Sequence, residues 1–190
     1  MGTILYYGRV TPRQVTPPPI RTPRLTLVPS TPALLHLEMD DSAGFATALQ
    51  AVVPKDWPPG EYDRDAMEFF LQKMSEGGDA AIGWYGWYAI RRSTETEPSS
   101  LVGGGGYLGP PDASGCVEIG YSVSEQWRGQ GIAAEMVTAL MKNAFENGAV
   151  RIIAHTQPDN PGSIAVLKSC GFQLAASADP TVLEFEFTAP

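Results

Sequence analysis

The segment QWRGQGIAA, residues 126–134, places two glycines one residue apart beside an arginine and directly before a helical pattern. The first amides of a helix have no partner within the helix, and together with the helix dipole they bind anions. Small residues at Gly131 and Ala133 would let phosphate groups reach these amides, whereas a larger side chain would block them. The alternative is a tight turn in which Gly129 and Gly131 only let the backbone bend. The segment therefore predicts a phosphate cradle or a simple turn.

Two titratable side chains near this segment could take a proton from a substrate. Glu118 lies in CVEIGYSV, residues 116–123, on the face opposite a mostly apolar row. His155 lies near the end of VRIIAHTQ, residues 150–157. A carboxylate or an imidazole can act as a general base. We expect Glu118 to be the base ahead of His155, since a carboxylate would also hold a cationic substrate. A structural role is the alternative for each.

The loop VVPKDWPPGEYD, residues 52–63, combines aromatic and acidic side chains. Such a loop can shape a pocket for a cation, because aromatic faces and carboxylates both attract positive charge. We therefore expect Trp57 and Glu61 to contact a substrate, together with Trp84 in the next strand pattern. The alternative for Trp57 is that it only fixes the loop onto the core.

Regular elements must hold these side chains in place, and apolar periodicity predicts them. The glycine segment lies in a strand–turn–helix–strand unit, the setting in which a helix N-terminus can receive a phosphate. Four consecutive glycines, 103–106, lie in a strand pattern and mark the close approach of another backbone or of a ligand. We expect strands over 24–29, 80–92, 100–111, 116–123 and 150–157, helices over 30–49, 64–74 and 132–148, and one or two strands within 171–187.

The composition describes one globular domain, because 43% of the 190 residues are hydrophobic and 18% are charged. Residues 1–19 are rich in proline and are expected to form an arm outside a domain of residues 20–190. The formal net charge of -8 argues against nucleic acid or an anionic membrane as a partner and favours a cationic substrate.

The cysteine content and the apolar segments indicate the cellular compartment in which the protein is expected. The two cysteines indicate neither a disulfide framework nor a zinc site. We also find no apolar run long enough for a signal peptide or a membrane span. We therefore expect a cytoplasmic protein without a metal.

A dinucleotide-binding fold is an alternative, because GQGIAA also reads as G-x-G-x-x-A. Five residues, Ser124 to Arg128, separate the preceding strand pattern from the first glycine, and the unit lies late in the chain. The second strand pattern ends in AHTQ, without the acid that would hold a ribose. These features make an oxidoreductase the weaker interpretation.

The sequence EIGYSVSEQWRGQGIAAE, followed by AHTQPDNPGSIAVLKSCGF, resembles the GCN5-related N-acetyltransferase (GNAT) superfamily, in particular its ribosomal-protein N-terminal (RimJ/RimL-like) branch. The family pattern Gln/Arg-x-x-Gly-x-Gly/Ala stands here as residues 128–133, joined to Asn160, Ser163 and CGF. The resemblance covers residues 20–187 and is strongest over 116–172. It implies an α/β (α+β) fold, in which helices flank a mixed and mostly antiparallel sheet.

The resemblance implies that acetyl-CoA is the cosubstrate and that its diphosphate lies on the amides of the glycine segment. The backbone of residues 121–123 would bond the pantetheine arm, and Asn160 would bind near the thioester. A plain helix cap is the alternative for Asn160. The implied cofactor-binding residues are Tyr121, Val123, Arg128, Gly129, Gln130, Gly131, Ile132, Ala133, Ala134 and Asn160.

The resemblance also implies acetyl transfer to a primary amine by direct attack in a ternary complex. Many relatives carry a tyrosine acid four residues before the glycine of the GF pair, where this chain has Leu167. Ser163, a water and Asn160 are therefore the candidates to stabilise the leaving thiolate. Because this chain lacks that tyrosine, a non-catalytic acyl-CoA sensor stays open as an alternative function. The acceptor, a protein N-terminus or a small cationic amine, and a homodimer are further hypotheses.

Overall fold

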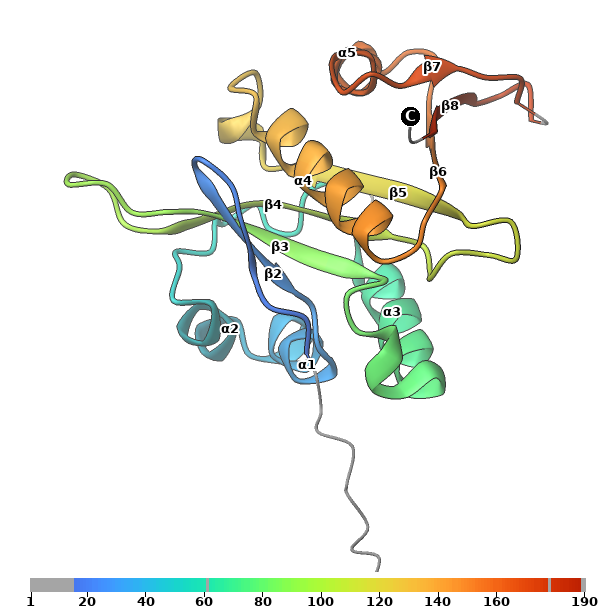
Figure 1. Ribbon diagram of the computed structural model, residues 1–190. Coiled ribbons are helices and arrows are strands. Elements are labelled where there is room, and N and C mark those ends of the chain that lie inside the picture. Colours follow the sequence, from blue (N-terminus) through green and yellow to red (C-terminus); the bar gives the residue numbers. More distant parts are fainter. Residues whose placement is uncertain (1–15, 61, 178, 189–190) are drawn as a thin grey trace, which may run out of the picture.

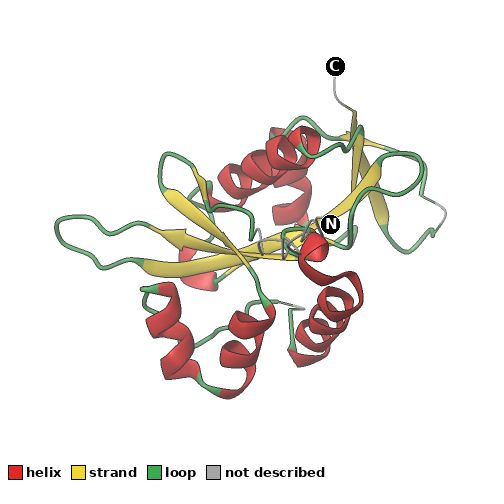
Figure 2. Ribbon diagram, turned by 60° about the horizontal axis from the view of Figure 1, so that its bottom comes forward, coloured by secondary structure: helices red, strands yellow, loops and turns green. Residues whose placement is uncertain are grey.

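The computed structural model describes residues 16–188 apart from residues 61 and 178. It shows a sheet with helices on both faces (Figures 1 and 2). The strands are β1 (Ile20–Arg21), β2 (Leu25–Pro29), β3 (Gly86–Arg91), β4 (Ser100–Tyr107), β5 (Cys116–Val123), β6 (Arg151–Thr156), β7 (Gln173–Leu174) and β8 (Leu183–Thr188). The helices are α1 (Pro32–Asp40), α2 (Ser42–Leu49), α3 (Arg64–Gly77), α4 (Ile132–Glu146) and α5 (Pro161–Ser169), with short 3-10 turns η1 (Gly78–Ala81) and η2 (Glu125–Trp127).

The described strands form one sheet in the order β1-β2-β3-β4-β5-β6-β8-β7. The pairing of β5 with β6 is parallel, and the other neighbours are antiparallel. The expected mixed and mostly antiparallel α/β fold is confirmed. The parallel pairing joins only residues 116–118 to residues 151–153. Beyond these residues β5 and β6 diverge.

Helix α4 covers one face of the sheet, and α1, α2 and α3 cover the other (Figure 1). On the α4 face, Met136 and Leu140 are fully buried in a core cluster that includes Val117 and Ile119 of β5. The alternation expected in β5 is thus confirmed, since its apolar row faces α4. Glu118 belongs to the other row and therefore lies on the face toward α1–α3.

The helix expected over residues 30–49 is interrupted at Asp41, so this expectation is corrected to two helices. Asp41 has φ and ψ angles of -144° and 81°, outside the helical region, and its side chain accepts a hydrogen bond from the Gly44 amide at 2.9 Å. A short acidic side chain competes in this way with the helix interior by capping the next helix. At the start of α1, Thr31 is the cap, because its side chain accepts a bond from the Leu34 amide.

The strand expected over residues 80–92 begins only at Gly86, because residues 78–81 form the turn η1. The four glycines of β4 lie directly beside the first residues of β3. A Cβ atom added at Gly106 would lie 1.6 Å from the carbonyl oxygen of Tyr85. Close approach of another backbone, expected from the glycines, is confirmed at this position.

Most of the expected N-terminal arm, residues 1–15, lies outside the described residues. Residues 16–19 form no helix or strand, and Pro17 lies close to Gly83, where an added Cβ atom would be 2.8 Å from the proline Cγ. The domain boundary near residue 20 stays a prediction.

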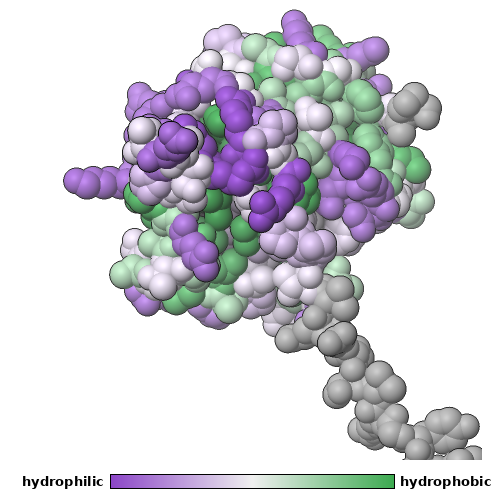
Figure 3. Space-filling view, turned by 60° about the vertical axis from the view of Figure 1, so that its left-hand side comes forward, coloured by the Kyte–Doolittle hydropathy of each residue, from purple (hydrophilic) through white to green (hydrophobic). Residues whose placement is uncertain are grey.

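The surface is an ordinary mixture of polar and apolar side chains. Hydrophilic and hydrophobic residues are interspersed on the face shown in Figure 3. Within the described ranges, every helix is too short or too polar to cross a bilayer. The most exposed large hydrophobic residues come from separate elements and loops: Val52, Phe69, Leu108, Val150 and Leu174.

We predict that Gly106→Ala destabilises the protein by about 3 kcal/mol, because a methyl group would collide with the backbone of Tyr85. Gly120 is the matched control, since it pairs with Gly106 across β4 and β5 and an added Cβ atom there meets nothing within 4 Å. Gly120→Ala should change the free energy of unfolding by less than about 1 kcal/mol. Urea denaturation measures the free energy of unfolding of both variants. Equal losses of stability would show that the contact with Tyr85 is not the cause of the destabilisation.

Candidate functional site

A cavity of about 1210 Å³ lies where β5 and β6 diverge. One end, here called the donor end, is lined by the turn before α4 and by the first turn of α4. The other, the acceptor end, is lined by α3, the loop before it and the glycines of β4. His155 and Ser163 also line this cavity. Ligands bound at the two ends can therefore meet inside the domain.

The N-terminus of α4 builds the donor end. Its cap residue Gly131 provides no side-chain bond to the first amides, which leaves them available to a ligand. Gly129 and Gly131 have φ angles of 72° and 74°, a region that strains any residue with a side chain. Ala133 and Ala134 line the cavity with methyl groups only. The backbone from Gly129 to Ala134, here called the cradle, thus has the form expected for an anion site.

The two polar side chains of the cradle turn are already engaged. Arg128 lines the cavity and donates from Nε to the Val123 carbonyl at 3.0 Å. Gln130 donates to the Gln126 carbonyl at 3.0 Å and does not line the cavity. Ile132 is buried in the core. Of the side chains expected beside the diphosphate, the structure therefore places that of Arg128 on the cavity wall, while that of Gln130 lies elsewhere.

The edge of β5 that faces β6 has no strand partner after Glu118. Its opposite edge stays paired with β4 as far as Val123. An extended ligand can add to such a free edge as another strand would. The backbone of residues 121–123 is therefore open to an extended ligand, apart from the Val123 carbonyl that Arg128 already bonds. Its contact with the pantetheine arm stays a prediction.

Helix α5 supplies polar groups on the other side of the gap. The Asn160 side chain accepts a bond from the Ser163 amide at 3.0 Å, so the residue is a helix cap, and it also lines the cavity. The Tyr121 hydroxyl lies 3.0 Å from the Ser163 hydroxyl. Burial raises the pKa of Tyr121 to about 12, so this hydroxyl keeps its proton at neutral pH. Leu167 is fully buried and does not line the cavity.

His155 is held between two carboxylates from neighbouring strands. Its Nδ1 lies 2.8 Å from Glu118 Oε1, and its Nε2 lies 3.3 Å from Glu184 Oε2. The hydrogen bond to Glu118 raises the pKa of His155, although partial burial acts against this. His155 lines the large cavity, whereas Glu118 lines a smaller neighbouring cavity of about 240 Å³. The two bases expected from the sequence are thus brought together. Across the described ranges, no group of three or more His, Cys, Asp or Glu residues is arranged to hold a metal.

The acceptor end is walled by aromatic side chains, among them Tyr62, Phe70 and Tyr88. The hydroxyls of Tyr62 and Tyr88 donate to the Glu38 carboxylate at 2.9 and 2.6 Å. The Trp57 indole donates to the same carboxylate at 2.7 Å. Burial raises the pKa of Glu38, and these three hydrogen bonds oppose the rise. Glu38 therefore fixes two tyrosines of the wall and the loop that precedes α3.

The tryptophans expected to contact a substrate do not line the large cavity. Trp57 is tied to Glu38 and packs beside Tyr88, with ring centroids 6.4 Å apart, as its loop-fixing alternative requires. Trp84 packs against Tyr107 at 5.2 Å. Glu61 lies outside the described residues. A substrate contact of these three residues stays a prediction.

Sequence reasoning missed Glu38 and Glu184. Glu184 meets His155 because the two residues are directly paired across β6 and β8, and periodicity alone does not reveal which strands are neighbours. In the sequence, Glu38 is only one polar residue in an ordinary helical pattern. Its three partners come from the loop and from β3, which only the fold brings to it.

Comparisons with known proteins agree with this geometry. Residues 24–173 match the family model of the acetyltransferase (GNAT) domain. The chain is 29% identical to the N-acetyltransferase YjdG of Bacillus subtilis (strain 168) over 120 residues, which are 63% of this chain and 68% of YjdG. It is similar in structure to RimL, a ribosomal alpha-N-protein acetyltransferase, with a TM-score of 0.61 and 20% identity, over 90% of this chain and 94% of RimL. Mycobacterium smegmatis RimJ in complex with CoA-disulfide gives a TM-score of 0.58 and 19% identity, over 90% of this chain and 86% of RimJ.

The family match spans β2 to β6, the cradle and α5, and the mostly antiparallel sheet sets aside the dinucleotide-binding alternative. The chain therefore belongs to the GNAT family of acetyltransferases, and it is an N-acetyltransferase with acetyl-CoA as its cosubstrate.

Proposed function

We propose that the protein transfers the acetyl group of acetyl-CoA to a primary amine, which attacks the thioester directly while both substrates are bound. The observation that carries this proposal is the single cavity that includes the cradle, His155 and the acceptor end. The free cysteines Cys116 and Cys170 do not line this cavity, so neither is placed to carry the acetyl group as an intermediate. Direct attack is therefore the favoured route.

His155 is the proposed group that accepts the proton of the amine. An alkyl amine has a pKa of about 10, so near neutral pH it must lose a proton before it can attack. The carboxylates of Glu118 and Glu184 attract the cation and hold the imidazole on the cavity wall. In this assignment Glu118 orients His155 and does not take the proton itself. The order expected from the sequence, with Glu118 first, is thereby reversed.

The leaving thiolate needs a hydrogen-bond donor. Ser163 and Tyr121 both line the cavity, and their hydroxyls lie within 3.0 Å of each other. Because Tyr121 keeps its proton at neutral pH, it can donate to a thiolate directly or through Ser163. This pair of hydroxyls takes the role that the tyrosine replaced by Leu167 has in many relatives.

The acceptor end suits an organic ammonium ion. Its described lining includes the aromatic rings of Tyr62, Phe70 and Tyr85 and the glycines at 104–106. Aromatic faces attract cations, and glycines leave the floor free of side chains. The acceptor is a protein N-terminus, as in the name of RimL, or a small-molecule amine.

A panel of amines tests this function. Purified protein is mixed with acetyl-CoA and with peptides that have a free N-terminus, polyamines or aminoglycosides, and thiol release and product mass are followed. Peptides with a blocked N-terminus and no lysine are the controls. We expect thiol release with at least one amine and a product that carries one acetyl group. Tight binding of CoA without turnover of any amine would favour the sensor.

We predict that His155→Ala lowers kcat about a hundredfold or more, the usual contribution of a general base, while CoA affinity stays within about twofold. Part of the rate should return at higher pH as free amine becomes available. His36→Ala is the matched control, because His36 is the other histidine of the chain and is exposed on α1. If Glu118→Gln costs more rate than His155→Ala, the carboxylate is the base.

The pKa of His155 gives a prediction that needs no acceptor. It lies above the ordinary value of 6.5, chiefly because of the hydrogen bond to Glu118. Its stabilising contribution is therefore complete below that value and is lost as pH rises through the folded-state pKa. Glu118→Gln should lower the pKa of His155, and NMR titration measures this with His36 as an internal reference. If the pKa of His155 stays unchanged in this variant, the hydrogen bond to Glu118 is not what raises it.

A further inference from the structure

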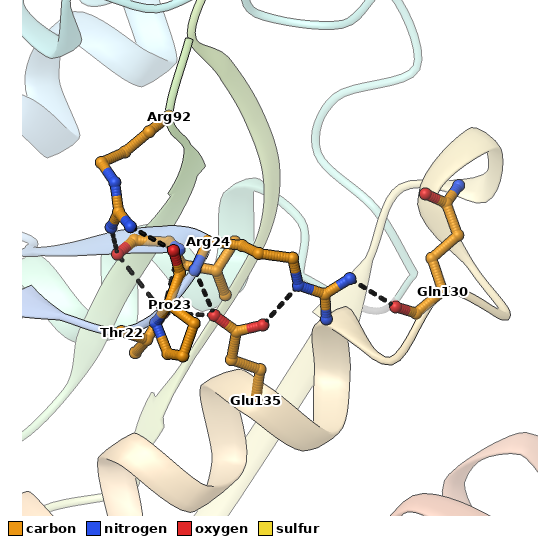
Figure 4. Close-up of polar contacts among 7 residues, drawn as sticks. Thr22, Pro23, Arg24, Arg92, Gln130 and Glu135 are labelled. Carbon is orange, nitrogen blue, oxygen red and sulfur yellow. Dashed lines mark hydrogen bonds and ion pairs between the residues drawn. The ribbon is translucent and has the colours of Figure 1, made fainter. Parts of the chain in front are cut away.

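Arg24, directly before β2, reaches the cradle and α4 across the structure (Figure 4). Its amide and its Nε donate to the two carboxylate oxygens of Glu135 at 2.8 and 2.6 Å. Its Nη1 donates to the carbonyl of Gln130 at 2.8 Å. The Thr22 hydroxyl donates to the same Glu135 carboxylate. The first strands of the sheet are thus tied to the anion site by one arginine.

The bond to Gln130 orients a peptide group of the cradle. In a planar trans peptide, the carbonyl of one residue and the amide of the next point in opposite directions. Because the Gln130 carbonyl is held toward Arg24, the Gly131 amide points away from Arg24. Gly131 lines the cavity, whereas Arg24 and Gln130 do not. Arg24 therefore turns a carbonyl away from the anion site and an amide toward it.

Glu135 would otherwise oppose an anion at the cradle. It lies in the first turn of α4, and its side chain is only 13% exposed, so water screens its charge poorly. Burial raises the pKa of Glu135, but the hydrogen bonds from Thr22 and Arg24 and the charge of Arg24 outweigh this and hold the pKa below its usual range. The carboxylate is therefore ionised. The guanidinium of Arg24 compensates this charge and leaves the positive helix end available.

We propose that Arg24 is a positioning residue of the donor site, which keeps the cradle in its diphosphate-binding form by holding the Gln130 carbonyl and neutralising Glu135. It acts through the cradle and not on the acetyl group or the amine. This inference concerns the binding of acetyl-CoA alone. Its binding test is therefore independent of the base and of the acceptor.

Calorimetry with CoA tests the proposal without an acceptor. For Arg24→Gln we expect the Kd for CoA to rise about tenfold or more, the loss typical of hydrogen bonds to charged groups. Arg24→Lys keeps the charge but cannot bond Glu135 and Gln130 through one planar fork, so it should weaken CoA binding by less. Arg92→Gln is the matched control, because Arg92 donates to carbonyls within residues 23–25 and should leave the Kd unchanged (Figure 4).

A second measurement separates positioning from a general loss of structure. S-acetylpantetheine carries the thioester but no diphosphate, so in Arg24→Gln its kcat/KM should stay within about twofold while that of acetyl-CoA falls. Unaltered CoA affinity, or an equal loss of kcat/KM with both donors, would overturn the proposal. Circular dichroism checks that each variant is folded. If Arg24→Gln does not fold, the same comparisons with Arg24→Lys decide.

Discussion

The early end of the pairing between β5 and β6 is the constraint on which the site depends. The parallel bonds stop at Glu118 and Ile153, yet each strand keeps its other neighbour, β4 on one side and β8 on the other. The sheet can therefore open a gap without leaving either strand unsupported. The cradle follows the end of β5, His155 lies near the end of β6, and α5 follows β6. The cradle, His155 and α5 are therefore located by this gap.

Two side chains from the first strands and helices fix the two ends of the cavity. Glu38 gathers the aromatic wall at the acceptor end, and Arg24 holds the cradle at the donor end. Both act through hydrogen bonds to groups that are distant in sequence. The electrostatics differ along the cavity, because the N-terminus of α4 favours an anion whereas the carboxylates beside His155 favour a cation. These charges support the proposal that the two substrates bind in different parts of one cavity.

The sequence by itself determined most of the elements and the turn before α4, because both rest on local patterns. Strict alternation located β5 at residues 116–123, and helical apolar spacing after Gly131 located α4. The form of the cradle could be predicted because amides at a helix start are unpaired wherever the helix lies. Local competition also explains the error in residues 30–49, where Asp41 caps a second helix in place of extending the first.

Only the tertiary structure decided which residues meet across the gap. Glu184 faces His155 through the register of β6 and β8, and Arg24 faces Glu135 because the chain before β2 meets the first turn of α4. Periodicity gives the face on which a side chain lies, but not which element packs on that face. The role of Glu38 likewise arises from packing, since its three hydrogen-bond donors come from the loop before α3 and from β3. Such contacts depend on long-range packing, because strand order and helix crossing are set by burying the whole core and not by any one segment.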